Sequence, residues 1–213
     1  MNLDPHHMRQ NYSKGELLES AVNPDPIRQF TTWFSEATES GLIEPNAMTL
    51  STITSDGRPD ARIVLLKSID PRGFVFFTNY DSRKGKQLSA HPVAALTFFW
   101  DTLERSVRIE GTVEKIARAE SEAYFQSRPR MSQLGAWVSR QSAVISGREV
   151  LEKEMDGLQT RFGVGAIPTP PYWGGYRVIP DAIEFWQGRR SRLHDRLRYR
   201  RENQNWNIER LAP

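Results

Sequence analysis

The sequence predicts an α+β fold built around a mostly antiparallel sheet that curls into a barrel. Two observations carry this prediction: five segments with strand periodicity follow one another at short spacing, and segments with helical periodicity flank them. A chain of 213 residues is long enough to bury a core of its own. We expect a mobile N-terminal arm over residues 1–23 and a single domain over residues 24–213.

The helix signals begin near the N-terminus. Asp25 is a capping residue and Pro26 suits a first helical turn, so a helix begins there, and apolar residues recur at helical spacing until Gly41 ends it. Another helix is expected to start near Ser132. The remaining predicted helices cover residues 82–90, with Ser82 as the cap, about 118–127, and 147–162.

The strand signals begin at Met48, where the apolar period changes to alternation. Asp56-Gly57 and Pro71-Arg72-Gly73 are turn sequences that separate the first three strands. The predicted strands cover residues 48–55, 58–70, 74–79, 92–100, 104–116, 178–188 and 192–201.

The segment 192–200 alternates more strictly than any other. Its even-numbered positions are basic, whereas its odd-numbered positions are Leu193, Asp195, Leu197 and Tyr199. An extended chain would therefore carry one continuous basic face. Arginine binds phosphate through paired hydrogen bonds, so this face predicts an anionic partner. The alternation alone leaves open whether that partner is nucleic acid, a small phosphorylated ligand, or counterions in water.

Composition excludes several classes of protein. Lys and Arg together number 29 against 26 Asp and Glu, so the basic residues are concentrated locally, which weakens a general nucleic-acid interpretation. No Cys is present, which excludes disulfides and thiolate catalysis. The four His have no metal-ligand spacing, so we expect no metal. No apolar run suits a membrane span or signal peptide, and we expect a cytoplasmic protein.

Three segments combine cations and hydroxyls at the ends of predicted elements. Arg62 and Lys67 bracket an apolar strand, and Ser82-Arg83-Lys84-Gly85 stands at a helix start, where free N–H groups suit a phosphate. Residues 124–132 offer a Tyr hydroxyl, guanidinium groups and a Ser hydroxyl. Each segment also fits an ordinary structural role, as snorkelling strand-end charges, as a helix cap, or as charges that complement a helix dipole.

Two further features are ambiguous when taken singly. Gln141-Ser142 fits polar surface, and Trp186 fits a core. His194 lies between arginines, and their positive charge would lower its pKa and keep the imidazole neutral near pH 7. A neutral imidazole can donate or accept a hydrogen bond to a polar substrate, or it can be a solvated strand residue.

Taken together, the order and spacing of these segments closely resemble the pyridoxine (pyridoxamine) 5′-phosphate oxidase family, from about Arg9 to Pro213. The segments that carry the resemblance are RIVLLK, FFTN followed by SRKGKQ, YFQSRPRMSQLGAW, SRQS, WGGYRV, EFWQG, RLHDR and the terminal ERLAP.

The resemblance implies a split β-barrel homodimer with FMN at the subunit interface. It assigns FMN binding to Arg62, Ile63, Val64, Leu65, Leu66, Lys67, Phe77, Thr78, Arg83, Lys84, Ser106, Trp186 and Arg196, with Gln141 and Ser142 joining from the partner subunit. It assigns the substrate phosphate to Lys67, Tyr124, Arg128 and Ser132. Arg192, Leu193 and His194 would cover the substrate ring, and Arg9, Gln10, Asn11 and Tyr12 would close over the site.

Two positions depart from the family pattern. Ser106 stands where the family usually has Gln, so this shorter side chain would reach FMN through water. Phe77 stands where some members have Tyr, which leaves an apolar or backbone contact. Neither change removes a charged anchor, and we expect FMN binding to survive both.

The implied reaction oxidises pyridoxine 5′-phosphate or pyridoxamine 5′-phosphate to pyridoxal 5′-phosphate. A hydride passes from substrate C4′ to flavin N5, O₂ accepts the electrons, and H₂O₂ is released, with ammonia from the amine. Arg192 and His194 are the expected catalytic residues, and orientation of the substrate is favoured over proton abstraction. The alternatives are another flavin-dependent oxidoreductase on the same barrel, a nucleic-acid-binding module, and a non-catalytic carrier of pyridoxal phosphate or flavin.

Overall fold

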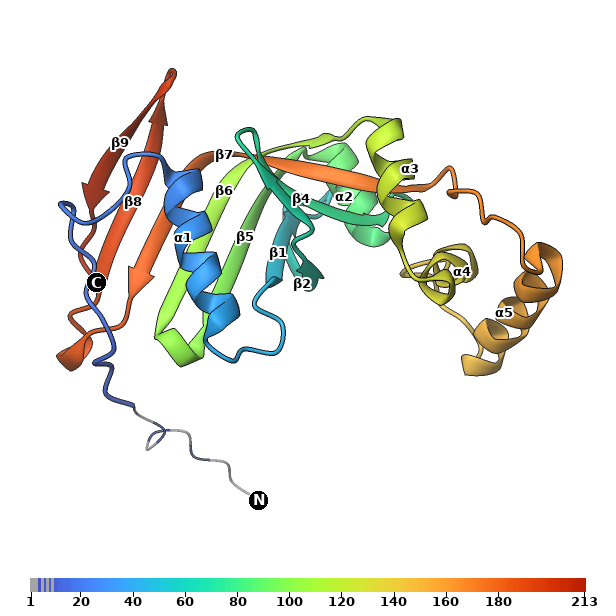
Figure 1. Cartoon of the computed structure of the whole chain (residues 1–213), viewed down its shortest axis with the longest axis horizontal. Helices are drawn as coiled ribbons and strands as arrows, with labels where there is room; N and C mark the ends of the chain where they lie inside the picture. The colour runs from blue at the N-terminus through green and yellow to red at the C-terminus, as the bar shows by residue number, and fades with distance from the viewer. Residues whose placement is uncertain (1–3, 5, 7, 9) are drawn as a thin grey trace. The chain divides into compact units, whose positions relative to one another are not determined.

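A computed structural model describes residues 4, 6, 8 and 10–213 (Figure 1). The chain divides into two compact units. The first unit comprises Met1–Leu50, Ala95–Glu110 and Pro180–Pro213, and the second comprises Ser51–Ala94 and Gly111–Ile179. These two units do not test the boundary that we expect at residue 23 between the arm and the domain, and that boundary stays a prediction.

The strands of the described residues form one nine-stranded sheet. They pair in the order β2-β1-β5-β6-β7-β4-β3, and β8 pairs with β7 and with β9. The pairings of β3 with β4, β4 with β7, β7 with β8, and β8 with β9 are antiparallel. The strands are β1 (Ala47–Ile53), β2 (Pro59–Leu65), β3 (Ser68–Asp70), β4 (Gly73–Asn79), β5 (Val93–Trp100), β6 (Arg105–Lys115), β7 (Trp173–Gln187), β8 (Asp195–Glu202) and β9 (Asn205–Arg210).

Five α-helices accompany this sheet in the described chain, so the α+β prediction is confirmed. They are α1 (Pro26–Glu39), α2 (Arg83–Ala90), α3 (Arg118–Ser127), α4 (Arg130–Val138) and α5 (Arg148–Phe162). The Asp25 carboxylate accepts the N–H of Ile27 at 2.8 Å, and Ser82 Oγ accepts the N–H of Gly85 at 3.2 Å, which confirms both predicted caps.

In the first unit, α1 covers the strands with an aromatic face. Phe30 packs against Phe98 with ring centroids 5.1 Å apart, and Trp33 meets Phe185 edge-on at 5.2 Å. Phe185 in turn packs against Tyr199 of β8 at 5.4 Å. Aromatic pairs of this kind contribute about 0.5–1.5 kcal/mol each beyond the area they bury. Large side chains therefore hold the helix to β5 and β7, and they hold β7 to β8.

The predicted strand over residues 192–201 is wrong at its start. Residues Arg190–Arg192 form a 3₁₀ turn, η3, in which Ser191 (φ 57°) and Arg192 (φ 61°) take the left-handed conformation. The chain becomes a strand only at Asp195, and Arg192 therefore does not share the basic face of β8. Leu197 and Tyr199 are fully buried on the opposite face, which fits the alternation from residue 195 onward. Strand β9 was not predicted.

In the second unit, the predicted strand over residues 58–70 is two strands. β2 ends at Leu65, and β3 pairs instead with β4, with Ile69 opposite Phe74 and Asp70 opposite Gly73. The N–H of Lys67 already bonds to the carbonyl of Val75, so the partner changes at residues 66–67. The turn predicted at residues 71–73 is confirmed.

Helices α3, α4 and α5 lie around the first residues of β7 (Figure 1). Their buried core is Phe125, Leu134, Ile167 and Trp173. Arg118 at the start of α3 donates to the carbonyls of Thr169, Pro170 and Trp173, so it holds the Pro-rich connector that leads into β7.

Gly85 lets the second unit pack tightly at α2. A Cβ at this position would overlap with the carbonyl oxygen of Tyr80, whereas a Cβ at Gly157 in α5 would meet nothing within 4 Å. Gly85→Ala should lower the free energy of unfolding by about 1–3 kcal/mol through overpacking. Gly157→Ala is the matched control, and it should raise the same quantity by about 0.5–1 kcal/mol. Urea denaturation measures both, and equal effects of the two substitutions would contradict this account of Gly85.

Candidate functional site

A cavity of about 520 Å³ in the second unit collects many of the predicted site residues. Strands β2, β4 and β7 and helices α3 and α4 all supply lining residues. The predicted residues that line this cavity are Leu65, Lys67, Phe77, Thr78, Tyr124, Arg128, Ser132 and Gln141. We call it the Arg128 cavity.

Arg128 is a half-buried cation whose charge faces no carboxylate among the described residues. Its guanidinium lies over the ring of Trp173 at 4.9 Å and over that of Phe125 at 5.7 Å. Its Nη1 atom is buried and has no hydrogen-bond acceptor in the described chain. Burial lowers the pKa of the guanidinium below its ordinary value. A buried donor without an acceptor costs about 1–3 kcal/mol, so an anionic ligand in this cavity would supply the missing partner.

Three stacked aromatic rings form one wall of the Arg128 cavity. Phe77 lies nearly parallel to Tyr124, at 4.0 Å and 22°, and to Trp173, at 5.2 Å and 13°, and the latter two rings are 6.2 Å apart. The Phe77 ring therefore fixes the position of the Tyr124 ring. The sequence assigned Phe77 to FMN alone, and nothing in its local sequence indicated this stack.

A second group of cations stands at the N-terminus of α2. One carboxylate oxygen of Asp60 accepts Arg62 Nη2 at 2.8 Å and Arg83 Nε at 2.7 Å. Lys84 is half-buried, and burial followed by the charge of Arg62 lowers its pKa. Arg62 and Arg83 thus share one carboxylate, and Lys84 adds a third positive charge at the helix N-terminus, which is suitable chemistry for a phosphate dianion. Sequence reasoning did not identify Asp60.

Gln141 and Ser142 reach this cation group within one chain. Gln141 Oε1 accepts Lys84 Nζ at 2.8 Å and Thr78 Oγ1 at 3.0 Å, and Ser142 Oγ accepts the N–H of Arg83 at 3.3 Å. The resemblance implied that this pair joins from the partner subunit. Within one chain the pair contacts Thr78, Arg83 and Lys84, and its assignment to the partner's site stays a prediction.

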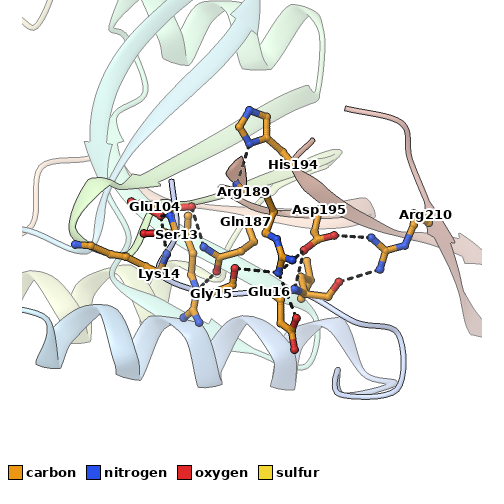
Figure 2. Close-up of polar contacts among 12 residues, drawn as sticks. Ser13, Lys14, Gly15, Glu16, Glu104, Gln187, Arg189, His194, Asp195 and Arg210 are labelled. Carbon is orange, nitrogen blue, oxygen red and sulfur yellow. Dashed lines mark hydrogen bonds and ion pairs between the residues drawn. The ribbon is translucent and has the colours of Figure 1, made fainter. Parts of the chain in front are cut away.

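The first unit holds Tyr12, Trp186 and His194. His194 packs against Trp186 with centroids 4.6 Å apart, and Tyr12 contacts both rings at 5.7 Å. His194 Nδ1 accepts the N–H of Arg189 at 3.1 Å (Figure 2). Neutral His194 therefore carries its proton on Nε2 and presents a donor on that side. Burial, followed by the charge of Arg192, lowers its pKa, as the sequence predicted.

The basic face of β8 is largely neutralised by carboxylates of the chain itself. Arg196 Nε donates to Glu184 at 2.7 Å, and this hydrogen bond raises the pKa of Arg196. Arg198 and Arg200 both bond to Glu209 of β9. Arg198 and Arg200 thus have a carboxylate partner within the chain, and neither is a candidate for a phosphate.

The other residues assigned by the resemblance lie outside the groups described above. Ser106 Oγ donates to the carbonyl of Phe98 at 2.9 Å, so its hydroxyl already has a backbone partner. Arg9 lies outside the described residues. Gln10, Asn11, Ile63, Arg192 and Leu193 are exposed, Val64 is half-buried, and Leu66 is buried.

No group of three or more His, Cys, Asp or Glu side chains in the described chain is arranged to hold a metal ion. The same residues include no helix that is long and apolar enough to cross a membrane.

Comparison with known proteins defines the class of this fold. The structure of PhzG from Burkholderia lata 383 in complex with tetrahydrophenazine-1-carboxylic acid is similar, with a TM-score of 0.88 and 32% identity over 94% of this chain and 100% of that one. A pyridoxamine 5′-phosphate oxidase-related, FMN-binding protein from Nostoc punctiforme shares the fold, with a TM-score of 0.71 at 18% identity over 88% and 97% of the two chains. The fold is an α+β split barrel, as predicted.

Sequence comparison gives the family. Residues 34–162 match the model described as pyridoxamine 5′-phosphate oxidase, and residues 173–213 match the C-terminal dimerisation region of pyridoxine 5′-phosphate oxidase. The pyridoxine/pyridoxamine 5′-phosphate oxidase of Gloeothece citriformis is 58% identical over 207 residues, which cover 97% of each chain. The chain therefore belongs to the pyridoxamine 5′-phosphate oxidase family.

The lowered pKa of His194 predicts a pH dependence of stability. The folded-state pKa lies below the ordinary value of 6.5, so the unfolded chain takes up the proton first as pH falls. The stabilisation from neutral His194 is full above pH 6.5 and is lost as pH falls through the lowered folded-state value. Thermal midpoints between pH 8 and pH 5 should therefore decline less in His194→Gln than in the wild type, with His91→Gln as the control. Parallel profiles for the wild type and His194→Gln would contradict the prediction.

Proposed function

We propose that this protein is an FMN-dependent oxidase that converts pyridoxine 5′-phosphate and pyridoxamine 5′-phosphate to pyridoxal 5′-phosphate. The observation that carries the proposal is the buried, unpartnered Nη1 of Arg128 in an aromatic-walled cavity. Lys67, Tyr124 and Ser132 line the same cavity and add an ammonium and two hydroxyls. This donor set suits a phosphate attached to a flat ring. The name of the Gloeothece relative supports the same substrates.

The cation group at α2 fits the FMN phosphate. Arg62, Arg83 and Lys84 would bind its oxygens, with Gln141 and Ser142 beside them, while residues 63–67 and 77–78 would line the flavin. Trp186, Arg196 and Ser106 would complete the set. A homodimer with FMN at the subunit interface is part of the proposal, and the match to a dimerisation region supports it.

When bound, FMN would supply the redox chemistry for oxidation of substrate C4′, with O₂ as the electron acceptor, H₂O₂ as a product and ammonia from the amine substrate. The protein's own residues bind and orient. Arg128 and its neighbours would hold the phosphate and so fix the distance of the ring from the flavin. Arg192 would orient the substrate near C4′, and His194 would donate a hydrogen bond from Nε2–H rather than remove a proton.

A second candidate is another flavin-dependent reaction on the same barrel. The similarity to PhzG, which was solved with a tetrahydrophenazine carboxylic acid, favours that candidate. A carboxylate carries one negative charge and a phosphate about two, so the cationic Arg128 cavity favours the phosphate ester. The carboxylate of the competing ligand would leave part of the donor set of Lys67, Arg128 and Ser132 unused.

The decisive test is an assay of the purified protein with FMN. We expect H₂O₂ from pyridoxine 5′-phosphate and from pyridoxamine 5′-phosphate, and none from unphosphorylated pyridoxine. Arg128→Met should raise KM by about 100-fold, because about 3 kcal/mol of charge-assisted hydrogen bonding is lost, and leave FMN affinity unchanged. Arg130→Met is the matched control in the same segment, since Arg130 bonds only to the carbonyls of Gly163 and Gly165 among the residues that the structure describes. A colourless protein that stays inactive with added FMN would refute the proposal.

Substitutions at Arg192 and Lys84 should distinguish residues that bind the substrate from residues that bind the cofactor. Arg192→Met should lower kcat/KM by about 100-fold through loss of orientation, with FMN affinity within about twofold of the wild type. Lys84→Met should do the reverse, with a weaker Kd for FMN and nearly normal kcat/KM at saturating FMN. Flavin fluorescence quenching measures the Kd. An Arg192→Met effect confined to FMN affinity would overturn its assignment to the substrate side.

A further inference from the structure

The segment that follows Tyr12 crosses the first unit without regular secondary structure, so its backbone N–H groups need partners elsewhere. Two of them bond to a single side chain 90 or more residues away. The N–H groups of Ser13 and Lys14 donate to Glu104 Oε2 at 2.7 and 3.0 Å (Figure 2). Lys14 Nζ adds a bond to the carbonyl of Thr102 at 2.6 Å.

Glu104 is a buried carboxylate with a constrained backbone. It is only 8% exposed and takes the left-handed conformation (φ 53°, ψ 41°) between a 3₁₀ turn, η2 (Asp101–Leu103), and β6. In the described chain, the Glu104 carboxylate accepts hydrogen bonds from the Ser13 and Lys14 backbone and pairs with no cation. A buried carboxylate is satisfied by charge-assisted hydrogen bonds of this kind, and its desolvation is costly without them.

The backbone of Glu104 fixes the surface on which Tyr12 lies. Its carbonyl accepts the N–H of Gly188 at 2.8 Å and Gln187 Nε2 at 3.3 Å. A Cβ at Gly188 would stand 2.7 Å from the Tyr12 ring, so only glycine permits this approach. A Cβ at Gly15 would likewise stand 3.0 Å from Gln187 Oε1. Glu104 therefore binds the arm through its side chain and the start of the loop after β7, at Gly188, through its backbone carbonyl.

Other polar contacts of the arm lie farther along it. The N–H of Leu17 donates to Asp195 at 3.1 Å, and Arg210 pairs with Glu19 at 2.7 Å. The Arg210 and Glu19 side chains are 38% and 52% exposed, and ion pairs at such exposure contribute little. The Glu104 bonds differ in their place, because they are made by the two residues directly after Tyr12.

We propose that Glu104 is a positioning residue: by binding the N–H groups of Ser13 and Lys14, it seats the Tyr12 ring against Trp186 and His194. Its consequence for catalysis rests on the proposed function, in which these rings border the substrate. Loss of the two bonds releases Tyr12 and weakens substrate binding, while the chemistry of the bound complex changes little.

The test compares substitutions at position 104 that the left-handed backbone tolerates differently. Glu104→Asn suits that conformation but is one methylene too short to reach the arm. Glu104→Gln keeps the length and an oxygen that accepts both N–H groups. Glu39→Asn, at an exposed site in the same unit, is the matched control. Ser13→Pro removes a donor from the arm itself and leaves residue 104 intact, so it keeps the test valid if Glu104→Asn fails to fold.

The first readout is amide hydrogen exchange in the full-length protein, which needs no activity. In Glu104→Asn, exchange at Ser13 and Lys14 should quicken at least about tenfold, on the scale of one charge-assisted hydrogen bond, while amides of β7 keep their wild-type rates. Glu104→Gln should restore most of the protection. Unchanged exchange at Ser13 and Lys14 would overturn the proposal, and so would equal acceleration throughout the first unit.

The second readout is steady-state kinetics with pyridoxine 5′-phosphate at saturating FMN. Glu104→Asn and Ser13→Pro should each raise KM about tenfold, with kcat within about twofold and FMN affinity unchanged. Faster exchange with an unchanged KM would overturn the positioning role. If the wild-type protein oxidises neither substrate, the proposed function fails, and the exchange rates alone then decide whether Glu104 holds the arm.

Discussion

Compensation of half-buried and buried cations is the constraint on which the candidate site depends. Arg177 is 2% exposed, yet Asp70 at 2.7 Å and Glu114 at 3.3 Å neutralise its charge, although its Nε lacks an acceptor. Arg128 has a buried Nη1 without an acceptor and no carboxylate partner in the described chain. The charge of Arg177 is neutralised by carboxylates of the chain itself, whereas neutralising the charge of Arg128 takes an anion from outside the described chain. That difference makes Arg177 a structural arginine and Arg128 a candidate for ligand binding.

The same reasoning explains how far the alternating basic segment could be interpreted from sequence. Alternation correctly predicted that Arg196 and Arg198 share a face, because the period of a strand is local. It could not predict their counter-charges, since Glu184 and Glu209 reach them through strand pairing. It also failed at Arg192, where two successive left-handed residues replace the strand. Left-handed conformations at Ser and Arg have no local sequence signal.

Local signals predicted the elements well, and long-range ones were missed. Caps at Asp25 and Ser82 depend on side chains a few residues away, so the sequence could predict the starts of α1 and α2. The break between β2 and β3 depends on a change of pairing partner, which periodicity does not record. Glu104 shows the same limit at the site, because 91 residues separate it from Ser13. The site residues themselves came from the order of several motifs, not from any single one.

The loop between β7 and β8 links the arm to the candidate catalytic imidazole. The backbone N–H of Arg189 fixes His194 as the Nε2–H tautomer. The Arg189 side chain donates to the carbonyl of Gly15 at 3.3 Å and pairs with Glu16 (Figure 2). Ser191 and Arg192 store about 1–3 kcal/mol each as left-handed non-glycine residues. These contacts with the arm offset that strain. A chain whose arm is released would therefore hold the loop, and with it the donor direction of His194, less firmly.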